Sequence, residues 1–284
     1  MLQIFGGRLE KISLQKLLFL VCNKQKEPRY EFIPYLYGCY SYSANADLFT
    51  MVKKGLLSED DSSYVKGERT DYLSMLDEED RKFVQDTYKK FYQADKESLM
   101  LHTYIHFPYY AINSKVAGSL LDPDQLDKIE SVRPIEKTIT LYTIGYEGVS
   151  LEAYLNKLIK HYIHVLVDVR NNPLSQKFGF SKNQLKRYCE GLHIEYLHFA
   201  DVGIQAEFRQ ELKNQDDYDR LFAVYKSKTL SETISTQKKI LDLLKENRRI
   251  ALTCFEANIC QCHRTHLAEA ISRLPGWDYE LKHI

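Results

Sequence analysis

The chain has 284 residues, which is more than one typical compact domain and enough for two. Hydrophobic residues make up 44% and charged residues 27%, a composition that excludes a largely disordered protein. The formal net charge is zero, which excludes a chain-wide attraction to nucleic acid or membrane. Any such binding must come from a local patch.

No targeting signal is expected at the start of the chain. Residues 1–13 lack the charged and then apolar pattern of a signal peptide, and the longest apolar run, residues 17–22, is far too short to cross a bilayer. Six cysteines at irregular spacing favour free thiols or metal ligands over disulfides. The sequence therefore predicts a soluble, cytoplasmic protein that does not bind membranes.

The first part of the chain has an order of elements typical of a winged helix-turn-helix domain. The expected elements are a helix over 11–22, a helix over 43–54, a two-stranded hairpin over 58–75 around Gly67, and a helix over 77–96. They predict an α-rich, winged-helix-like domain over residues 1–120. The motifs Lys-Leu-Leu-Phe-Leu at 16–20 and Pro-Tyr-Leu-Tyr-Gly at 34–38 resemble those of winged-helix domains in bacterial regulators.

Local charge bears on whether this domain binds nucleic acid. Residues 1–57 contain eight Lys and Arg against four acids, whereas residues 58–79, the expected wing, contain two against eight. An acidic wing would repel a phosphate backbone. Nucleic-acid binding and protein contacts, including a homodimer, are both left open for this domain.

Residues 121–137 are expected to link two domains. They contain two prolines, several acids and little periodicity. From there to residue 284 the pattern alternates between strands and helices. Strands are expected over 138–145, 164–169, 194–199 and 249–255, and helices over 150–159, 181–191, 207–225, 231–247 and 263–274. This alternation predicts an α/β domain over 138–284, with a mostly parallel sheet flanked by helices.

Candidate site residues, most of them polar, follow each of the expected strands. They are Gly145, Tyr146 and Glu147 after the first strand, Asp168 and Arg170 after the second, Asp201 after the third, and Cys254 and Glu256 after the fourth. Because the carboxyl ends of parallel strands meet at one edge of a sheet, we expect one polar pocket there.

The residue types suggest an anion-binding pocket with embedded carboxylates. Arg170, Arg264 and the helix start near Cys262 would attract a phosphate or carboxylate. Asp168, Glu147 and Glu256 would supply general acid, general base or nucleophilic oxygens. The alternative is that Asp168 and Arg170 simply pair with each other.

Cys254 is a second candidate centre. A thiol at a strand end, facing His263 and a helix start, is placed to become a reactive thiolate, although a buried structural cysteine is the alternative. Zinc could be bound by Cys254, Cys260, Cys262 and His263. Their spacing differs from common zinc signatures, so no cofactor is expected.

Four motifs of this half resemble those of the bacterial domain-of-unknown-function family 488. They are Thr-Ile-Gly-Tyr at 143–146, Asp-Val-Arg-Asn-Asn-Pro-Leu-Ser at 168–175, Gly-Leu-His-Ile-Glu-Tyr at 191–196, and Cys-Phe-Glu at 254–256 with Cys-His-Arg at 262–264. The resemblance implies an α/β domain with a site that comprises Asp168, Arg170, Cys254, Glu256, Cys262, His263 and Arg264. We expect Tyr146, Gly145 and Ser175 to help to bind the substrate. The resemblance does not bring a reaction with it.

The sequence as a whole favours an enzyme. We expect a hydrolase or transferase that acts on a glycosidic or phosphoester bond of a nucleotide or nucleic acid, with the N-terminal domain recruiting the substrate. The alternative is a ligand-sensing, DNA-binding regulator whose α/β half binds an anionic small molecule without turnover.

Overall fold

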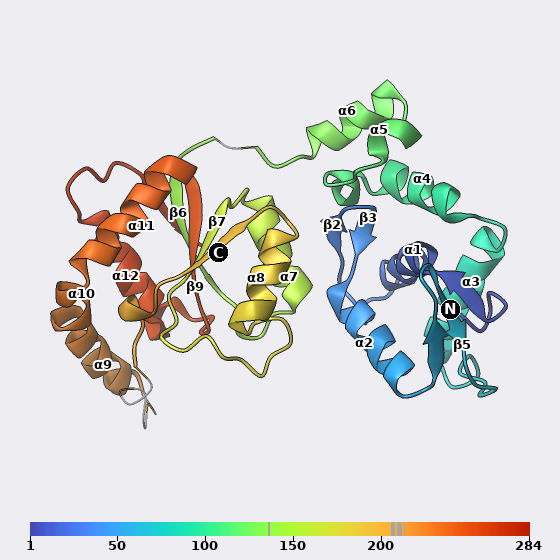
Figure 1. The fold of residues 1–284 in the computed structure, drawn as a ribbon, viewed down its shortest axis with the longest axis horizontal. Coiled ribbons are helices and arrows are strands. Elements are labelled where there is room, and N and C mark those ends of the chain that lie inside the picture. Colours follow the sequence, from blue (N-terminus) through green and yellow to red (C-terminus); the bar gives the residue numbers. More distant parts are fainter. Residues whose placement is uncertain (136, 206–207, 209–211, 213) are drawn as a thin grey trace. The chain divides into compact units, whose positions relative to one another are not determined.

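The structure is a computed structural model that describes residues 1–135, 137–205, 208, 212 and 214–284. The chain divides into two compact units, Met1–Arg133 and Pro134–Ile284 (Figure 1). Each unit has a hydrophobic core of its own. The candidate site lies in the second unit.

The N-terminal unit combines helices with two small antiparallel sheets. Its strands are β1 (Arg8–Glu10), β2 (Ile33–Tyr35), β3 (Gly38–Tyr40), β4 (Leu57–Glu59) and β5 (Ser63–Lys66). Its helices are α1 (Lys11–Cys22), α2 (Tyr42–Lys53), α3 (Glu78–Phe91), α4 (Lys96–His106), the short 3-10 helix η1 (Pro108–Ala111), α5 (Ala117–Leu120) and α6 (Pro123–Ser131). One sheet has the order β1-β5-β4, and the other pairs β2 with β3.

The expected hairpin over 58–75 is shorter in the structure. Strands β4 and β5 turn at Asp60, whose Oδ1 accepts hydrogen bonds from the backbone N–H groups of Ser62 and Ser63 at 2.9 and 2.8 Å. A side chain that satisfies the backbone of its own turn stabilises that turn. The turn therefore forms there and not at Gly67.

Two expected helices have different outcomes. The helix over 11–22 is confirmed, because α1 spans these residues. The expected helix over 77–96 is too long, since α3 ends at Phe91. Asp95 then caps a new helix, α4, by accepting a hydrogen bond from the N–H of Ser98 at 2.8 Å.

The segment expected to be a linker, 121–137, contains a helix. Pro123–Ser131 form α6, in which Asp122 accepts from the N–H of Gln125 while the Gln125 side chain accepts from the N–H of Asp122. Pro123 is a favourable first residue of this helix, because an N–H at that position would have no acceptor within the helix. Ile129 is buried, so α6 belongs to the packed N-terminal unit.

The C-terminal unit is built on a five-stranded sheet of order β10-β6-β9-β7-β8. Its strands are β6 (Thr140–Gly145), β7 (Val165–Asp168), β8 (Glu195–His198), β9 (Arg249–Cys254) and β10 (Glu280–His283). Its helices are α7 (Leu151–Lys160), α8 (Lys182–Glu190), the 3-10 helix η2 (Ala200–Val202), α9 (Gln215–Ser227), α10 (Thr229–Glu232), α11 (Ile234–Asn247), the 3-10 helix η4 (Ile259–Gln261) and α12 (His263–Ser272). Across the described residues of both units, no helix is long and apolar enough to cross a bilayer.

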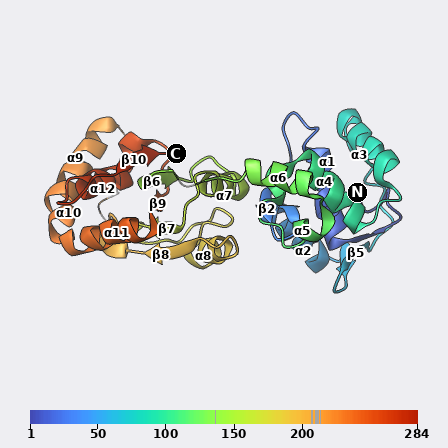
Figure 2. The same ribbon diagram turned by 90° about the horizontal axis from the view of Figure 1, so that it is seen from above.

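The two faces of the sheet carry different helices. Helices α7 and α8 lie on one face, and α9 to α12 lie on the other (Figures 1 and 2). Side chains alternate along a strand, so neighbouring residues point to opposite faces. On the α9–α12 face, Val169 and Cys254 join the core. On the α7–α8 face, the Thr253 hydroxyl accepts a hydrogen bond from Tyr154 of α7 at 2.8 Å.

The expected parallel sheet flanked by helices is confirmed, because every strand pair of this sheet is parallel. Strand β10 was not foreseen. The sequence pattern of Ser181 followed by Gln184 is that of a capping box at the start of the expected helix over 181–191, but no capping box forms. The Ser181 side chain makes no cap hydrogen bond to α8 and instead donates to the backbone oxygen of Ser175 at 2.7 Å. Most of the first residues of the expected helix over 207–225 lie outside the described residues.

Candidate functional site

The central strand of the parallel sheet ends at Cys254. Strand β9 lies between β6 and β7, and Cys254 pairs with Gly145 at the carboxyl end of β6. The chain then runs through η4 to Cys262 and enters α12 at His263. This strand end and helix start lie at the edge of the sheet where parallel α/β proteins bind ligands.

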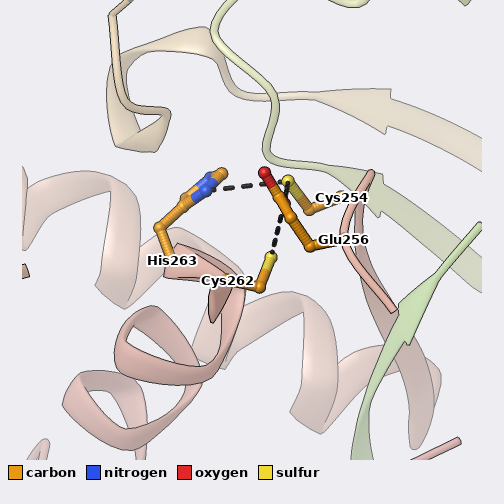
Figure 3. Close-up of side chains that lie close together, drawn as sticks. All are labelled: Cys254, Glu256, Cys262 and His263. Carbon is orange, nitrogen blue, oxygen red and sulfur yellow. Dashed lines mark hydrogen bonds between the residues drawn. The ribbon is translucent and has the colours of Figure 1, made fainter. Parts of the chain in front are cut away.

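Four side chains converge there and form what we call the Cys254 cluster: Cys254, Glu256, Cys262 and His263 (Figure 3). One ligand atom of each lies within 4.8 Å of the others. The sulfurs of Cys254 and Cys262 each lie 3.1 Å from Oε2 of Glu256, and the Cys254 sulfur lies 3.6 Å from Nδ1 of His263. Three members are buried and Glu256 is half-buried, so Glu256 is the member of the cluster that is partly exposed.

The orientation of His263 is set by the backbone just after β7. Its Nε2 lies 3.0 Å from the carbonyl oxygen of Val169. A carbonyl oxygen can only accept, so Nε2 carries the proton of this hydrogen bond. In the neutral ring Nδ1 then presents its lone pair, and this is the nitrogen that faces Cys254.

The thiol of Cys262 is held in its neutral form when the cluster is considered by itself. Burial, and then the neighbouring Cys254 thiol, raise the pKa of Cys262 well above its usual value. A thiol with a raised pKa is a poor nucleophile at neutral pH. Cys262 is therefore placed to bind or to pack, not to attack a substrate.

The loop that carries Glu256 is held from two sides. Arg264, which is buried at the start of α12, donates to the backbone oxygens of Glu256 and Ala257. On the other side lies Gly145, where an added Cβ would come within 2.1 Å of the Glu256 oxygen. The glycine is thus needed for close approach of two backbones, and both contacts fix where the Glu256 carboxylate can reach.

Asp168 and Arg170 form a separate, closed group on the opposite face of the sheet. Asp168 is fully buried, and both of its oxygens accept from the Arg170 guanidinium at 2.5 to 3.1 Å. Tyr196 donates to the same carboxylate at 2.5 Å, and Arg170 also donates to Tyr146 and to the backbone oxygen of Phe180. These contacts match the pairing that the sequence left as an alternative.

Electrostatics reinforce this pairing. Burial disfavours the charged guanidinium, but the hydrogen bonds and charge of Asp168 outweigh it, so the pKa of Arg170 lies above its usual value. The expected anion-binding role of the two arginines is not supported by their contacts. Arg170 is directed to Asp168, and Arg264 is directed to backbone carbonyls.

The other expected site residues are distributed around these two groups. The exposed Glu147 accepts from the N–H of Ala257 at 3.0 Å, which fastens the same loop. Ser175 accepts from the N–H of Lys177, within the segment before α8. Cys260 is exposed and lies outside the cluster, so the four donors differ from the set considered from the sequence: Glu256 replaces Cys260.

Comparison with known proteins gives one result. Residues 150–271 match the family model for the Domain of unknown function DUF488. No curated protein and no solved structure matches the chain. The DUF488 match includes Asp168, Arg170 and the whole Cys254 cluster, and it begins after the Gly145 turn. It supports the resemblance drawn from the C-terminal motifs.

A polar pocket beside the cluster was not foreseen from the sequence. Among its lining residues are Asn171, Asp201, Phe208, Tyr225 and Lys228. The ring of Tyr225 packs edge-on against the ring of His263 with centroids 5.6 Å apart, so this pocket and the cluster share a wall. Tyr225 lies inside a helix at a core position, and its spacing alone predicts only packing. Asp201, which follows the third expected strand, was the one signal that pointed here.

Proposed function

We propose that the C-terminal unit is a hydrolase or transferase whose reaction centre is the Cys254 cluster and whose substrate is a nucleotide or nucleic acid. The observation that carries the proposal is a half-buried carboxylate, Glu256, beside a buried imidazole and two buried thiols at the carboxyl end of the central strand. Such an arrangement suits the transfer of a proton to or from a reacting group.

Glu256 has the leading role in this proposal. Glu256 is the partly exposed member of the cluster and its backbone is held by Arg264, so the residue is both accessible and positioned. The carboxylate would take a proton from the attacking water or hydroxyl. The bond that breaks would be a phosphoester or glycosidic bond.

The neighbouring pocket supports a nucleotide as the substrate. Phe208 offers an exposed aromatic face on which a base can stack, and Lys228 offers a positive charge for a phosphate. Asp201 and Asn171 add polar groups suited to sugar hydroxyls and base edges. This pocket takes over the anion-binding role first expected of Arg170 and Arg264.

The N-terminal unit would recruit the substrate as a winged-helix domain. The strand order β1-β5-β4, with α1 and α2 between the first strand and the hairpin, supports that assignment. The hairpin pairs its acids with basic groups of the same unit, Asp60 with Arg8 and Glu59 with Lys11. Contact with nucleic acid would therefore involve α2 and not the acidic wing.

The test is product formation by the purified full-length chain. The chain is incubated with nucleotides, nucleosides and short single- and double-stranded oligonucleotides, and products are identified by mass spectrometry. We expect cleavage of one substrate class, with at least about a 100-fold loss of rate in Glu256→Gln, the range for removing a general acid or base.

The matched control is Cys260→Ser, which changes an exposed cysteine of the same loop outside the cluster and should keep the full rate. Equal rates in Glu256→Gln and the parent chain would refute the proposed centre. Tight binding of a nucleotide with no product would instead identify a ligand-sensing regulator.

A further inference from the structure

We propose that the Cys254 cluster is a zinc site in which Cys254, Cys262 and His263 are protein ligands and Glu256 occupies the fourth corner. This inference deepens the proposed function, and its catalytic part rests on that function. The metal-binding part stands on geometry alone. It departs from the expectation, drawn from sequence spacing, that no cofactor is bound.

The distances fit a four-coordinate ion. With Zn–S, Zn–N and Zn–O bonds of about 2.0 to 2.3 Å, neighbouring ligand atoms of a tetrahedron lie about 3.3 to 3.8 Å apart. In the cluster, the two sulfurs lie 3.1 Å from the carboxylate oxygen, and one sulfur lies 3.6 Å from the imidazole nitrogen. All four ligand atoms lie within 4.8 Å of one another, so side-chain shifts of roughly 1 Å would place them around one ion.

The donor types select zinc among the common divalent ions. Two thiolates and one imidazole are soft or borderline ligands, which favour zinc over magnesium or calcium. The charges of two thiolates balance those of a divalent cation. Glu256 is the one ligand near solvent, so it is the one that water or substrate can replace, as in catalytic zinc sites that keep one exchangeable position.

The hydrogen bond from His263 to Val169 is an independent observation in favour of a metal. Imidazole ligands of zinc usually donate their second ring N–H to a carbonyl or carboxylate, which fixes the tautomer. Here Nε2 donates to the carbonyl of Val169 at 3.0 Å, and the Nδ1 lone pair therefore faces the cluster. The imidazole is oriented as a ligand before any metal arrives.

The scaffold around the cluster is correspondingly stiff. Cys254 ends the central strand, and Cys262 and His263 begin α12. Arg264 and Gly145 hold the intervening loop, and Thr265 donates to the backbone oxygen of Ile259 at 3.0 Å. A site held on rigid elements needs little rearrangement on binding, which favours high affinity.

Zinc would also define the chemistry of the proposed reaction. A water molecule that takes the exchangeable position becomes acidic enough to ionise near neutral pH, and Glu256 lies beside it to accept the proton. The same ion could polarise a phosphoryl oxygen of the substrate. The buried thiols then act as ligands, and no covalent thiol intermediate is needed.

The test uses the full-length chain, purified under reducing conditions. Elemental analysis after zinc loading, and absorption spectra after titration with Co²⁺, measure the stoichiometry and the thiolate ligands directly. We expect one ion per chain and the intense charge-transfer bands of a tetrahedral Co²⁺–thiolate complex. The unaltered chain suffices for this measurement, so a poorly folding variant cannot obscure it.

Variants then locate the ion. Cys262→Ser and Cys254→Ser should weaken zinc binding by more than about 100-fold in competition with a chromophoric chelator. Changing a residue that only hydrogen-bonds to a metal ligand typically costs about 10- to 100-fold. Cys260→Ser should bind zinc as the parent chain does. No stoichiometric zinc in the parent chain, or parent-like affinity in both cluster variants, would overturn the site.

The metal site and the enzyme can fail separately. Zinc bound with no turnover of any nucleotide would leave the site standing and remove the proposed reaction. Turnover that persists in chelator-treated, metal-free protein would leave the enzyme standing and remove the metal.

Discussion

The two faces of the parallel sheet each gather polar residues at neighbouring strand ends, and each includes a carboxylate that has a different role on each face. On the α7–α8 face, Asp168 accepts from Arg170 and Tyr196 in a closed, buried group. On the α9–α12 face, the Cys254 cluster brings four donor atoms around one point and leaves a carboxylate near solvent. Closed pairing indicates a structural role, whereas convergence of ligand atoms next to a pocket indicates a functional one.

The largest effect that separates the faces should be on stability. Asp168→Asn leaves the buried Arg170 charge uncompensated, and breaking a buried pair costs about 3–5 kcal/mol. Urea unfolding of the chain measures this loss. The double variant Asp168→Asn/Arg170→Met should recover part of it, because no charge is then left buried. A stable Asp168→Asn chain that has lost its activity would instead move Asp168 into the functional site.

Zinc should stabilise the folded chain only through the Cys254 cluster. At a free concentration of about 100 times the dissociation constant, an ion that binds the folded chain alone raises the free energy of unfolding by about 2.7 kcal/mol. The gain should disappear in Cys262→Ser and persist in Cys260→Ser. Thermal unfolding with and without zinc measures it, and equal gains in both variants would point to binding elsewhere.

The close approach at Gly145 supports the cluster and can be tested by a matched pair of glycine variants. Gly145→Ala places a Cβ against the Glu256 backbone and should cost about 1–3 kcal/mol, the range for overpacking. It should also weaken zinc binding, because the loop must shift. Gly118→Ala, where a Cβ meets nothing within 4 Å, should be neutral or stabilise α5 by up to about 1 kcal/mol. Chemical denaturation compares the two.

The smallest expected effect concerns the hydroxyl that completes the closed group. Tyr196→Phe removes one hydrogen bond to the buried Asp168 carboxylate and should cost about 1–2 kcal/mol without changing zinc affinity. The exposed Tyr162→Phe is the control and should stay within about 0.5 kcal/mol. Loss of zinc affinity in Tyr196→Phe would show that the two faces are coupled.

The sequence by itself determined the alternation of strands and helices and the parallel sheet. Apolar periodicity reports local structure directly, and so helix α1 and strands β6, β7, β8 and β9 were predicted close to their bounds. Local patterns were misleading where a side chain had another partner. Ser181 bonds to Ser175 and not to its helix, and Pro123 starts a helix in the expected linker.

Only the tertiary structure decided which strand-end residues meet. Asp168 pairs with Thr253 of the neighbouring strand, and both side chains point to the α7–α8 face. Cys254 is the next residue after Thr253 and therefore points to the opposite face, so Asp168 and Cys254 do not share a pocket although both lie at the same edge of the sheet. Glu256 joins the cluster and Cys260 does not, because Arg264 and Gly145 hold the backbone of Glu256 in place. That backbone course depends on packing between distant segments, and residue spacing does not encode it.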